Sequence, residues 1–580
     1  MRFIMIQTLL EILYVSLISI SWGLPVIFFC RKNKSASFSL TVELAIFSFF
    51  CGLALISLCS SFLCLFSPLR YSWLLVLSIP FITTTFWILK RTGFPGLNIK
   101  NIFRKGHAAY LFFFLTTSLL FILLGSGQPA MEDTDLYHLQ IIRWNQEYGT
   151  IDGLANLFPK YGTFSSWLEL ISFFALPFPH QNFLFLNVTL SIWTCFFLVH
   201  KIAYHGLRTK GKQHSAFALL YLFILLFMLL EWNLFRGNSS SANFDFIVTA
   251  LILFILLIII EDMVESRYSS QLNFFPLVLL AASVPFFKMS GAPVLLILFF
   301  YLFISKARLK IFFTAALILL LFALPFLTRN YLQTGYFFYP YTILTPFAPP
   351  WQLPEAMANK HVDYITVCNR YLNQSIPPSV WLHPAGAGWV SGWPARLTLF
   401  NRILIFVTLL EIPCSFFVLR NRMLKDARKI SFLYGGCLLV LVAWFFLAPD
   451  PRFAYGFMLV PAFLIPAIPL AAYFKQWMIR LLLLLSSLAI IAYGAKKFSA
   501  AKLIQPDAIA APPYKTVMIN GSGYHMPEKL GRNWNIRCYY TGLPCICEMN
   551  PYLELMGKEL KDGFRMKPIT DSSFILNFRY

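Results

Sequence analysis

Residues 108–149 read AAYLFFFLTTSLLFILLGSGQPAMEDTDLYHLQIIRWNQEYG and join an apolar run to a dense group of charged side chains. The run 108–126 has no charged residue and is long enough to cross a bilayer, for which about 20 apolar residues suffice. Three carboxylates and one histidine follow between Glu132 and His138. Ionisable groups where a membrane helix emerges into water are candidates for chemistry at the membrane surface.

The composition of the chain is that of a membrane protein. Of its 580 residues, 58% are hydrophobic and 12% are charged, and the mean hydropathy is +0.67. Soluble globular domains do not have such a composition, and we predict an all-α polytopic membrane protein. The formal net charge of +22 could suggest a nucleic-acid partner. Lysine and arginine instead gather in the links between apolar runs, as in cytoplasmic loops, so no nucleic-acid partner is predicted.

The apolar segments predict about 14 transmembrane helices, some of them short or tilted. The expected spans are 4–29, 41–66, 71–89, 108–126, 182–203, 214–231, 244–262, 272–287, 290–304, 311–328, 401–419, 431–448, 455–473 and 478–495.

The loops between these spans alternate in charge. Every second loop is basic, and basic loops are expected in the cytoplasm. The basic loops are 31–34, 90–107, 201–212, 306–310 and 420–429. The alternation predicts that the large loops 127–181 and 329–400 face outward together with both termini.

The polar tail 496–580 is predicted to form a small extracytoplasmic domain of mixed α/β structure. If the compartment is oxidising, one disulfide can form among Cys538, Cys545 and Cys547. The cysteines of the apolar runs behave instead as small hydrophobic residues.

The sequence of the first large outer loop predicts two amphipathic helices that lie on the membrane surface. From 135 to 148, aromatic and aliphatic residues recur at helical spacing. A second helix is expected from near Thr163, where Ser166 and Glu169 fit a capping box before an apolar run.

Asp133 has two interpretations. An aspartate just before a helix is commonly an N-cap. One cap, however, does not need three acids, and the neighbours Glu132 and Asp135 would raise its proton affinity, which suits a general base. The three carboxylates could also bind a divalent metal ion, although no full ligand set can be recognised. No cofactor is otherwise predicted.

Three cations are expected on the same outer side. Lys288 interrupts an apolar hairpin, Arg329 follows a span, and Arg452 lies in the short turn between two spans. Each could snorkel to lipid headgroups. Together with nearby acids, they favour a site that holds an anionic headgroup by charge-assisted contacts.

Three further residues are substrate-binding candidates. Asp245 is expected at the start of a helix on the outer side, either as a cap or as a second acid. Lys160 could face the same cavity, although a solvated face would also explain it. Tyr137 lies beside His138 in the first outer loop.

The arrangement resembles the GT-C superfamily of membrane glycosyltransferases. Residues 133–167, DTDLYHLQIIRWNQEYGTIDGLANLFPKYGTFSSW, are similar to the signature of a bacterial GT-C-like group with a D-x-x-x-Y-H motif. Four further patches resemble that group: FFKMSGAP at 286–293, RNYLQTGYFFYP at 329–340, APDPRFAYG at 448–456 and RCYYTGLPC at 537–545. The resemblance covers most of residues 108–580.

The resemblance implies a sugar donor carried on polyprenyl phosphate at the outer face of the membrane of a bacterium. Asp133 would then deprotonate a glycan, lipid or protein acceptor, supported by Asp135 or His138. Lys288, Arg329 and Arg452 would bind the departing lipid phosphate, and transfer would invert the sugar.

The resemblance also divides the chain. Residues 1–107 would be additional N-terminal helices, 108–495 the GT-C-like catalytic module and 496–580 the outer domain. Lys160 and Ser165 stand where the group favours arginine and asparagine, so the resemblance assigns them no role.

Other functions fit the same pattern. A transporter or flippase of lipid-linked saccharides also places charges inside a helix bundle, but related halves with paired broken helices are not visible in the sequence. A polysaccharide polymerase or ligase would keep the chemistry and change the donor and acceptor. A GT-C scaffold without activity could serve in assembly or sensing.

Overall fold

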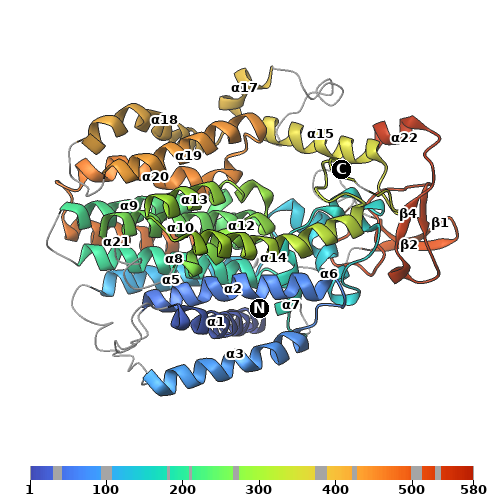
Figure 1. Cartoon of the computed structure of the whole chain (residues 1–580), viewed down its shortest axis with the longest axis horizontal. Helices are drawn as coiled ribbons and strands as arrows, with labels where there is room; N and C mark the ends of the chain where they lie inside the picture. The colour runs from blue at the N-terminus through green and yellow to red at the C-terminus, as the bar shows by residue number, and fades with distance from the viewer. Residues whose placement is uncertain are drawn as a thin grey trace.

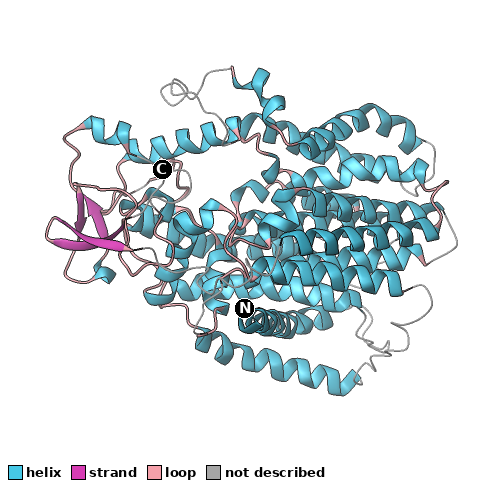
Figure 2. Ribbon diagram, turned by 180° about the vertical axis from the view of Figure 1, so that it is seen from behind, coloured by secondary structure: helices cyan, strands magenta, loops and turns pink. Residues whose placement is uncertain are grey.

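A computed structural model describes residues 2–30, 42–92, 107–178, 183–207, 212–265, 274–345, 347–372, 388–420, 427–497, 513–528 and 537–578. Within these residues the chain is a long bundle of helices with a small group of strands at one end (Figures 1 and 2). The apolar helices make it a multi-pass membrane protein.

Ten of the described helices are long and apolar enough to cross a membrane. They are α1 (Arg2–Phe29), α2 (Val42–Cys64), α3 (Tyr71–Thr92), α5 (Ala108–Gly125), α8 (Phe185–Gly206), α9 (Lys212–Leu230), α10 (Asp245–Glu265), α14 (Leu309–Thr334), α19 (Ala427–Leu447) and α21 (Gln476–Lys497). Helices α17 (Trp389–Arg396) and α18 (Leu399–Arg420) meet at a bend of 115° and could form an eleventh span.

The predicted count of 14 spans is not confirmed, although a helix lies at every predicted position. Three apolar helices are short: α12 (Phe275–Phe287), α13 (Val294–Ile304) and α20 (Tyr455–Leu470). At a rise of about 1.5 Å per residue, none of them reaches the roughly 30 Å of a hydrocarbon core. Residues at the start of α12 and at the end of α13 line the same cavity. The two helices therefore form a hairpin, and Lys288 lies at its tip.

The centre of the bundle is α10, whose apolar stretch is buried along its whole length and packs against α8, α12 and α20. Helices α1 and α2 cross at their glycines. A Cβ atom on Gly23 would lie 1.8 Å from the carbonyl oxygen of Ser48, and one on Gly52 would lie 1.8 Å from that of Ser19. Larger residues at these two positions would force the helices apart.

The two expected surface helices pack against the rest of the chain, the first along one face and the second on all sides. The π-turn η1 (Thr134–His138) leads into α6 (Leu139–Glu147), and every residue of α7 (Ser166–Phe174) is buried. The N-cap of α7 is Ser165, not Ser166, and Glu169 forms no capping box because its carboxylate pairs with Arg329. Helix α15 (Glu355–Tyr371) and the C-terminal segment lie at the same end as α6 (Figure 1). We call this end of the bundle the capped end.

The C-terminal segment contains two antiparallel strand pairs and a short helix. β1 (Tyr514–Ile519) pairs with β2 (Ser522–Pro527), β3 (Leu553–Leu555) pairs with β4 (Phe564–Met566), and α22 (Ser572–Asn577) follows. Cys538 and Cys545 form a disulfide, which confirms the prediction of one bridge in the tail. The segment packs directly on the loop 127–181, where the Phe564 amide donates to the Asp152 carbonyl at 2.9 Å.

Candidate functional site

Acidic and basic side chains from separate parts of the chain meet at the capped end. Most lie where a helix begins or ends, because polar groups there are not enclosed by apolar neighbours along a span. We call the following residues the capped-end cluster: Asp133, Tyr137, His138, Lys160, Asp245, Lys288, Tyr364 and Arg452.

Asp245 joins two of the predicted phosphate-binding cations. The ammonium of Lys288 donates to one carboxylate oxygen of Asp245, and the guanidinium of Arg452 lies 3.8 Å from the other. Arg452 also pairs with Asp450 at 2.9 Å. The carboxylate of Asp245 therefore pairs with two cations, and its assignment as a second acid stays a prediction. Lys288 and Arg452 are brought together as predicted, but each already has a carboxylate partner.

Asp133 is the free acid of the cluster. Its side chain makes no N-cap hydrogen bond. It is partly exposed, and no described residue forms a hydrogen bond or an ion pair with its carboxylate. Its negative charge nevertheless acts on Lys160, Arg452 and Tyr364. The carboxylate is therefore available to a substrate beside three groups that could hold an anion or a hydroxyl.

Lys160 is the free cation of the cluster. It is 6% exposed, which excludes the solvated face considered from the sequence. Its Nζ lies 3.3 Å from the Tyr364 hydroxyl, 4.7 Å from the centroid of that ring and 5.6 Å from the centroid of the Tyr137 ring. No carboxylate of a described residue lies within ion-pair distance. Burial lowers the pKa of Lys160, and the charge of Asp133 opposes that effect.

His138 is fully buried between aromatic rings. The centroid of its ring is 4.3 Å from that of Tyr137 and 5.2 Å from that of Phe244. Neither ring nitrogen has a hydrogen-bond partner among the described residues. Burial lowers the pKa of His138 to about 4, so the ring is neutral at pH 7. A buried imidazole without a partner is costly, and a bound ligand or water would satisfy it.

Asp135 and Glu132 serve a different purpose from the one predicted. The buried guanidinium of Arg537 lies 3.1 Å from a Glu132 oxygen and 3.7 Å from an Asp135 oxygen, and the Tyr539 amide donates to the Asp135 carbonyl at 3.0 Å. Both acids therefore attach the C-terminal segment to η1. Their ligand atoms do not converge with those of Asp133, so these residues do not fit the metal site considered from the sequence.

Arg329 lies outside the cluster. It is 2% exposed, pairs with the carboxylate of Glu169 and donates to Asn145 at 2.6 Å. The other oxygen of Glu169 accepts from Ser61. The predicted third phosphate ligand is thus a buried ion pair that joins α14 to α6, α7 and α2.

Sequence reasoning missed Tyr364 and the contact of His361 with Tyr339. Tyr364 and His361 both lie on α15. His361 is buried near Lys160, and its Nδ1 lies 2.7 Å from the Tyr339 hydroxyl. The apolar residues of α15 recur at helical spacing, so that one face of the helix is apolar and the other polar. This pattern could have indicated a helix that packs over the site. The partner of that helix could not be recognised from the sequence.

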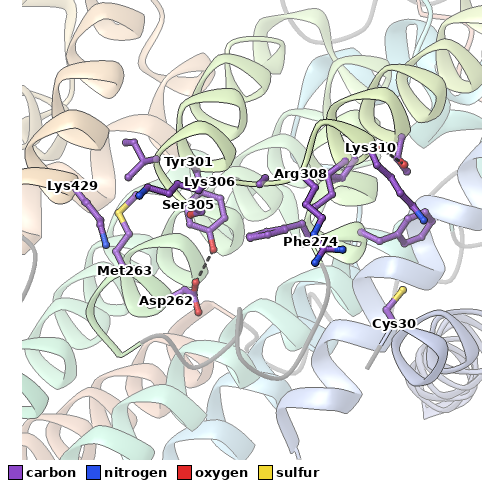
Figure 3. A pocket seen from close by; sticks show the side chains of 16 residues that line it. Cys30, Asp262, Met263, Phe274, Tyr301, Ser305, Lys306, Arg308, Lys310 and Lys429 are labelled. Carbon is purple, nitrogen blue, oxygen red and sulfur yellow. Dashed lines mark hydrogen bonds between the residues drawn. The ribbon is translucent and has the colours of Figure 1, made fainter. Parts of the chain in front are cut away.

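The opposite end of the bundle, which we call the basic end, holds a cavity of about 1140 Å³. Lys306, Arg308, Lys310 and Lys429 line it, and the Tyr301 hydroxyl donates to Asp262 at 2.7 Å across one wall (Figure 3). Four cations and one paired acid make this cavity suitable for an anionic group.

A family model described as a domain of unknown function, DUF8201, matches residues 5–459. The chain belongs to the DUF8201 family. No curated protein and no solved structure matches it. The DUF8201 region contains the whole capped-end cluster, whereas Arg537 and the four strands follow the region in the chain.

Proposed function

We propose that this DUF8201 protein is a membrane glycosyltransferase that moves a sugar from a polyprenyl-phosphate donor to an acceptor at the capped end. One observation carries the proposal: the free carboxylate of Asp133 and the free ammonium of Lys160 belong to one cluster. Sugar transfer from a lipid phosphate needs a base for the acceptor and a cation for the phosphate that leaves.

In the proposed reaction Asp133 takes the proton of an acceptor hydroxyl. The acceptor oxygen attacks C1 of the sugar from the face opposite the phosphate. The C1–O bond breaks, its electron pair goes to the phosphate oxygen, and the sugar is inverted. The polyprenyl phosphate and the protonated carboxyl of Asp133 remain in the site.

Lys160 is the best candidate for the first contact with the donor phosphate, because no described carboxylate competes for it. Lys288 and Arg452 supply a second positive region next to it, held in place by Asp245 and Asp450. A phosphate could approach this pair with little rearrangement, since preorganised charges need not reorient when charge develops.

The capped end is proposed to face outward from the cytoplasmic membrane of a bacterium, with both termini on that side. Two observations support this orientation. The disulfide Cys538–Cys545 lies in the segment at the capped end, and disulfides persist in oxidising compartments. The cavity with four cations lies at the other end, as expected for the cytoplasmic side.

The test is a transfer assay with the full chain in proteoliposomes. A panel of polyprenyl-phosphate hexoses and pentoses is supplied with a bacterial membrane extract as acceptor. We expect release of free polyprenyl phosphate together with labelled product for one donor of the panel. If no donor is consumed by protein that remains folded, the proposal fails.

A transporter or flippase of lipid-linked saccharides is the second candidate. The cavity at the basic end favours it, because it provides a region suited to anions at the end of the bundle opposite the capped-end cluster. Movement of a fluorescent polyprenyl-phosphate lipid between leaflets, weakened by Arg308→Ala but not by Asp133→Asn, would support the carrier over the transferase. A polymerase or ligase would instead keep the dependence on Asp133 and differ only in donor and acceptor.

A further inference from the structure

Two histidines and a glutamate from three helices converge at the basic end, opposite the end of the proposed chemistry. His205 belongs to the last turn of α8, His214 to the start of α9, and Glu265 ends α10. The two Nδ1 atoms lie 3.1 Å apart, and a Glu265 oxygen lies 3.5 Å from Nδ1 of His214. All three ligand atoms fall within 4.8 Å of one another.

The other face of His205 is held by a carboxylate. Its Nε2 lies 2.9 Å from Glu261, and the same carboxylate accepts from Lys201 at 2.6 Å and from Tyr221 at 2.5 Å. Glu261 is an acceptor, so Nε2 of His205 carries the proton and Nδ1 presents its lone pair to the centre of the group. A carboxylate behind a histidine in this way is the usual support of a metal-binding imidazole.

The charges around this group also favour a cation. Lys201 contacts two carboxylates, at 2.9 Å from Glu43 and 2.6 Å from Glu261, and Glu265 adds a third. With neutral imidazoles, these four residues carry two more negative than positive charges. A divalent ion would balance them. Most of the group is buried, and opposite charges attract one another more strongly there than in water.

We propose that His205, His214 and Glu265 bind one Zn²⁺ ion. Two imidazoles and one carboxylate form a known type of zinc ligand set, which leaves a fourth position open. At Zn–N distances of about 2.0–2.1 Å, tetrahedral geometry separates two nitrogens by about 3.3 Å. The separation of 3.1 Å between the Nδ1 atoms requires only a small adjustment. His214 and Glu265 are 20% and 14% exposed, so the ion could enter from the basic end.

The ion would connect the end of α8, the start of α9 and the end of α10. Since α10 begins with Asp245 at the capped end, a zinc ion here would fix the far end of the helix that positions Lys288 and Arg452. The site is separate from the proposed transfer chemistry and is tested without it.

The experiment uses the full chain, purified through an affinity tag without histidine, stripped with EDTA, equilibrated with ZnSO₄ and freed of unbound ions. Mass spectrometry of the metal content should give one zinc per chain for the wild type. His214→Ala and His205→Ala should lose it, and His200→Ala, a neighbouring histidine on α8 outside the ligand set, should keep it. Added zinc should also raise the melting temperature of the wild type and of His200→Ala only.

A direct measurement on the wild type guards against misfolded variants. Co²⁺ in place of Zn²⁺ should give the visible absorption of a tetrahedral site. If the wild type retains no zinc and gives no such spectrum, the two histidines are joined by a shared proton and the proposal is wrong. Zinc retention by His205→Ala and His214→Ala at the wild-type level would also contradict the proposal.

Discussion

The ammonium of Lys160 lies 3.3 Å from the hydroxyl of Tyr364, over a ring whose centroid is 4.7 Å away. Aromatic faces and one hydroxyl hold this cation without neutralising it. The charge of Asp133 acts on Lys160, and no described carboxylate pairs with Lys160. The proposed donor site depends on this cation.

Replacing Lys160 by methionine should weaken donor binding. Loss of one charge-assisted contact corresponds to a rise in donor KM of roughly 10- to 100-fold. The maximal rate should fall less, because Asp133 remains in place. Lys515→Met, an exposed lysine on β1, is the matched control and should leave KM unchanged. An unchanged donor KM for Lys160→Met would remove Lys160 from the site.

Replacing Asp245 by asparagine should destabilise the protein. The change leaves Lys288 without its carboxylate and weakens the support of Arg452. Removing one partner of a buried ion pair costs about 3–5 kcal/mol. The double variant Asp245→Asn/Lys288→Met should recover part of the loss in thermal unfolding, since it no longer leaves an unpaired cation. Equal stability of the single variant and the wild type would show that the pair contributes little.

Arg329 should matter for stability and not for the donor. Arg329→Met leaves the buried carboxylate of Glu169 unpaired, at a cost of about 3–5 kcal/mol. Arg329→Met/Glu169→Leu should be more stable than either single variant. The donor KM of any folded variant should equal that of the wild type. A large rise in the donor KM of Arg329→Met without a loss of stability would show that Arg329 binds the donor.

Because His138 is buried, we predict that the free energy of unfolding decreases in acid. Its pKa falls from 6.5 to about 4 on folding because of burial. The unfolded chain therefore binds a proton more readily than the folded chain, and stability falls as the pH drops from about 6.5 to 4. The full effect is roughly 3 kcal/mol. His138→Phe should flatten the profile of melting temperature against pH in this range. An unchanged slope would mean that His138 is not held neutral.

The sequence predicted the helical bundle well, because the apolar runs are long and periodic. It also predicted that Asp133, Lys288 and Arg452 share one end, since each follows or precedes a span. It did not distinguish Arg329 from these cations. That distinction depends on Glu169, which lies 160 residues away in the chain and matched a local capping pattern.

Tertiary contacts also explain the other differences. Asp135 looked like a catalytic partner because it lies two residues from Asp133, but Arg537 from the C-terminal segment neutralises it. The amphipathic pattern of α6 correctly indicated one apolar face. That face is covered by α7 and the C-terminal segment, and local periodicity cannot show whether lipid or protein covers a helix face.

The most direct test of the proposed function is sugar transfer by Asp133→Asn, measured in a single turnover with saturating polyprenyl-phosphate donor. Glu147→Gln, an exposed carboxylate on the same segment that pairs only with Arg143 in the described structure, is the control. We predict that Asp133→Asn still binds the donor but transfers at least about 100-fold more slowly, as expected for loss of a general base. The control should match the wild type. Transfer by folded Asp133→Asn at the wild-type rate would contradict the account.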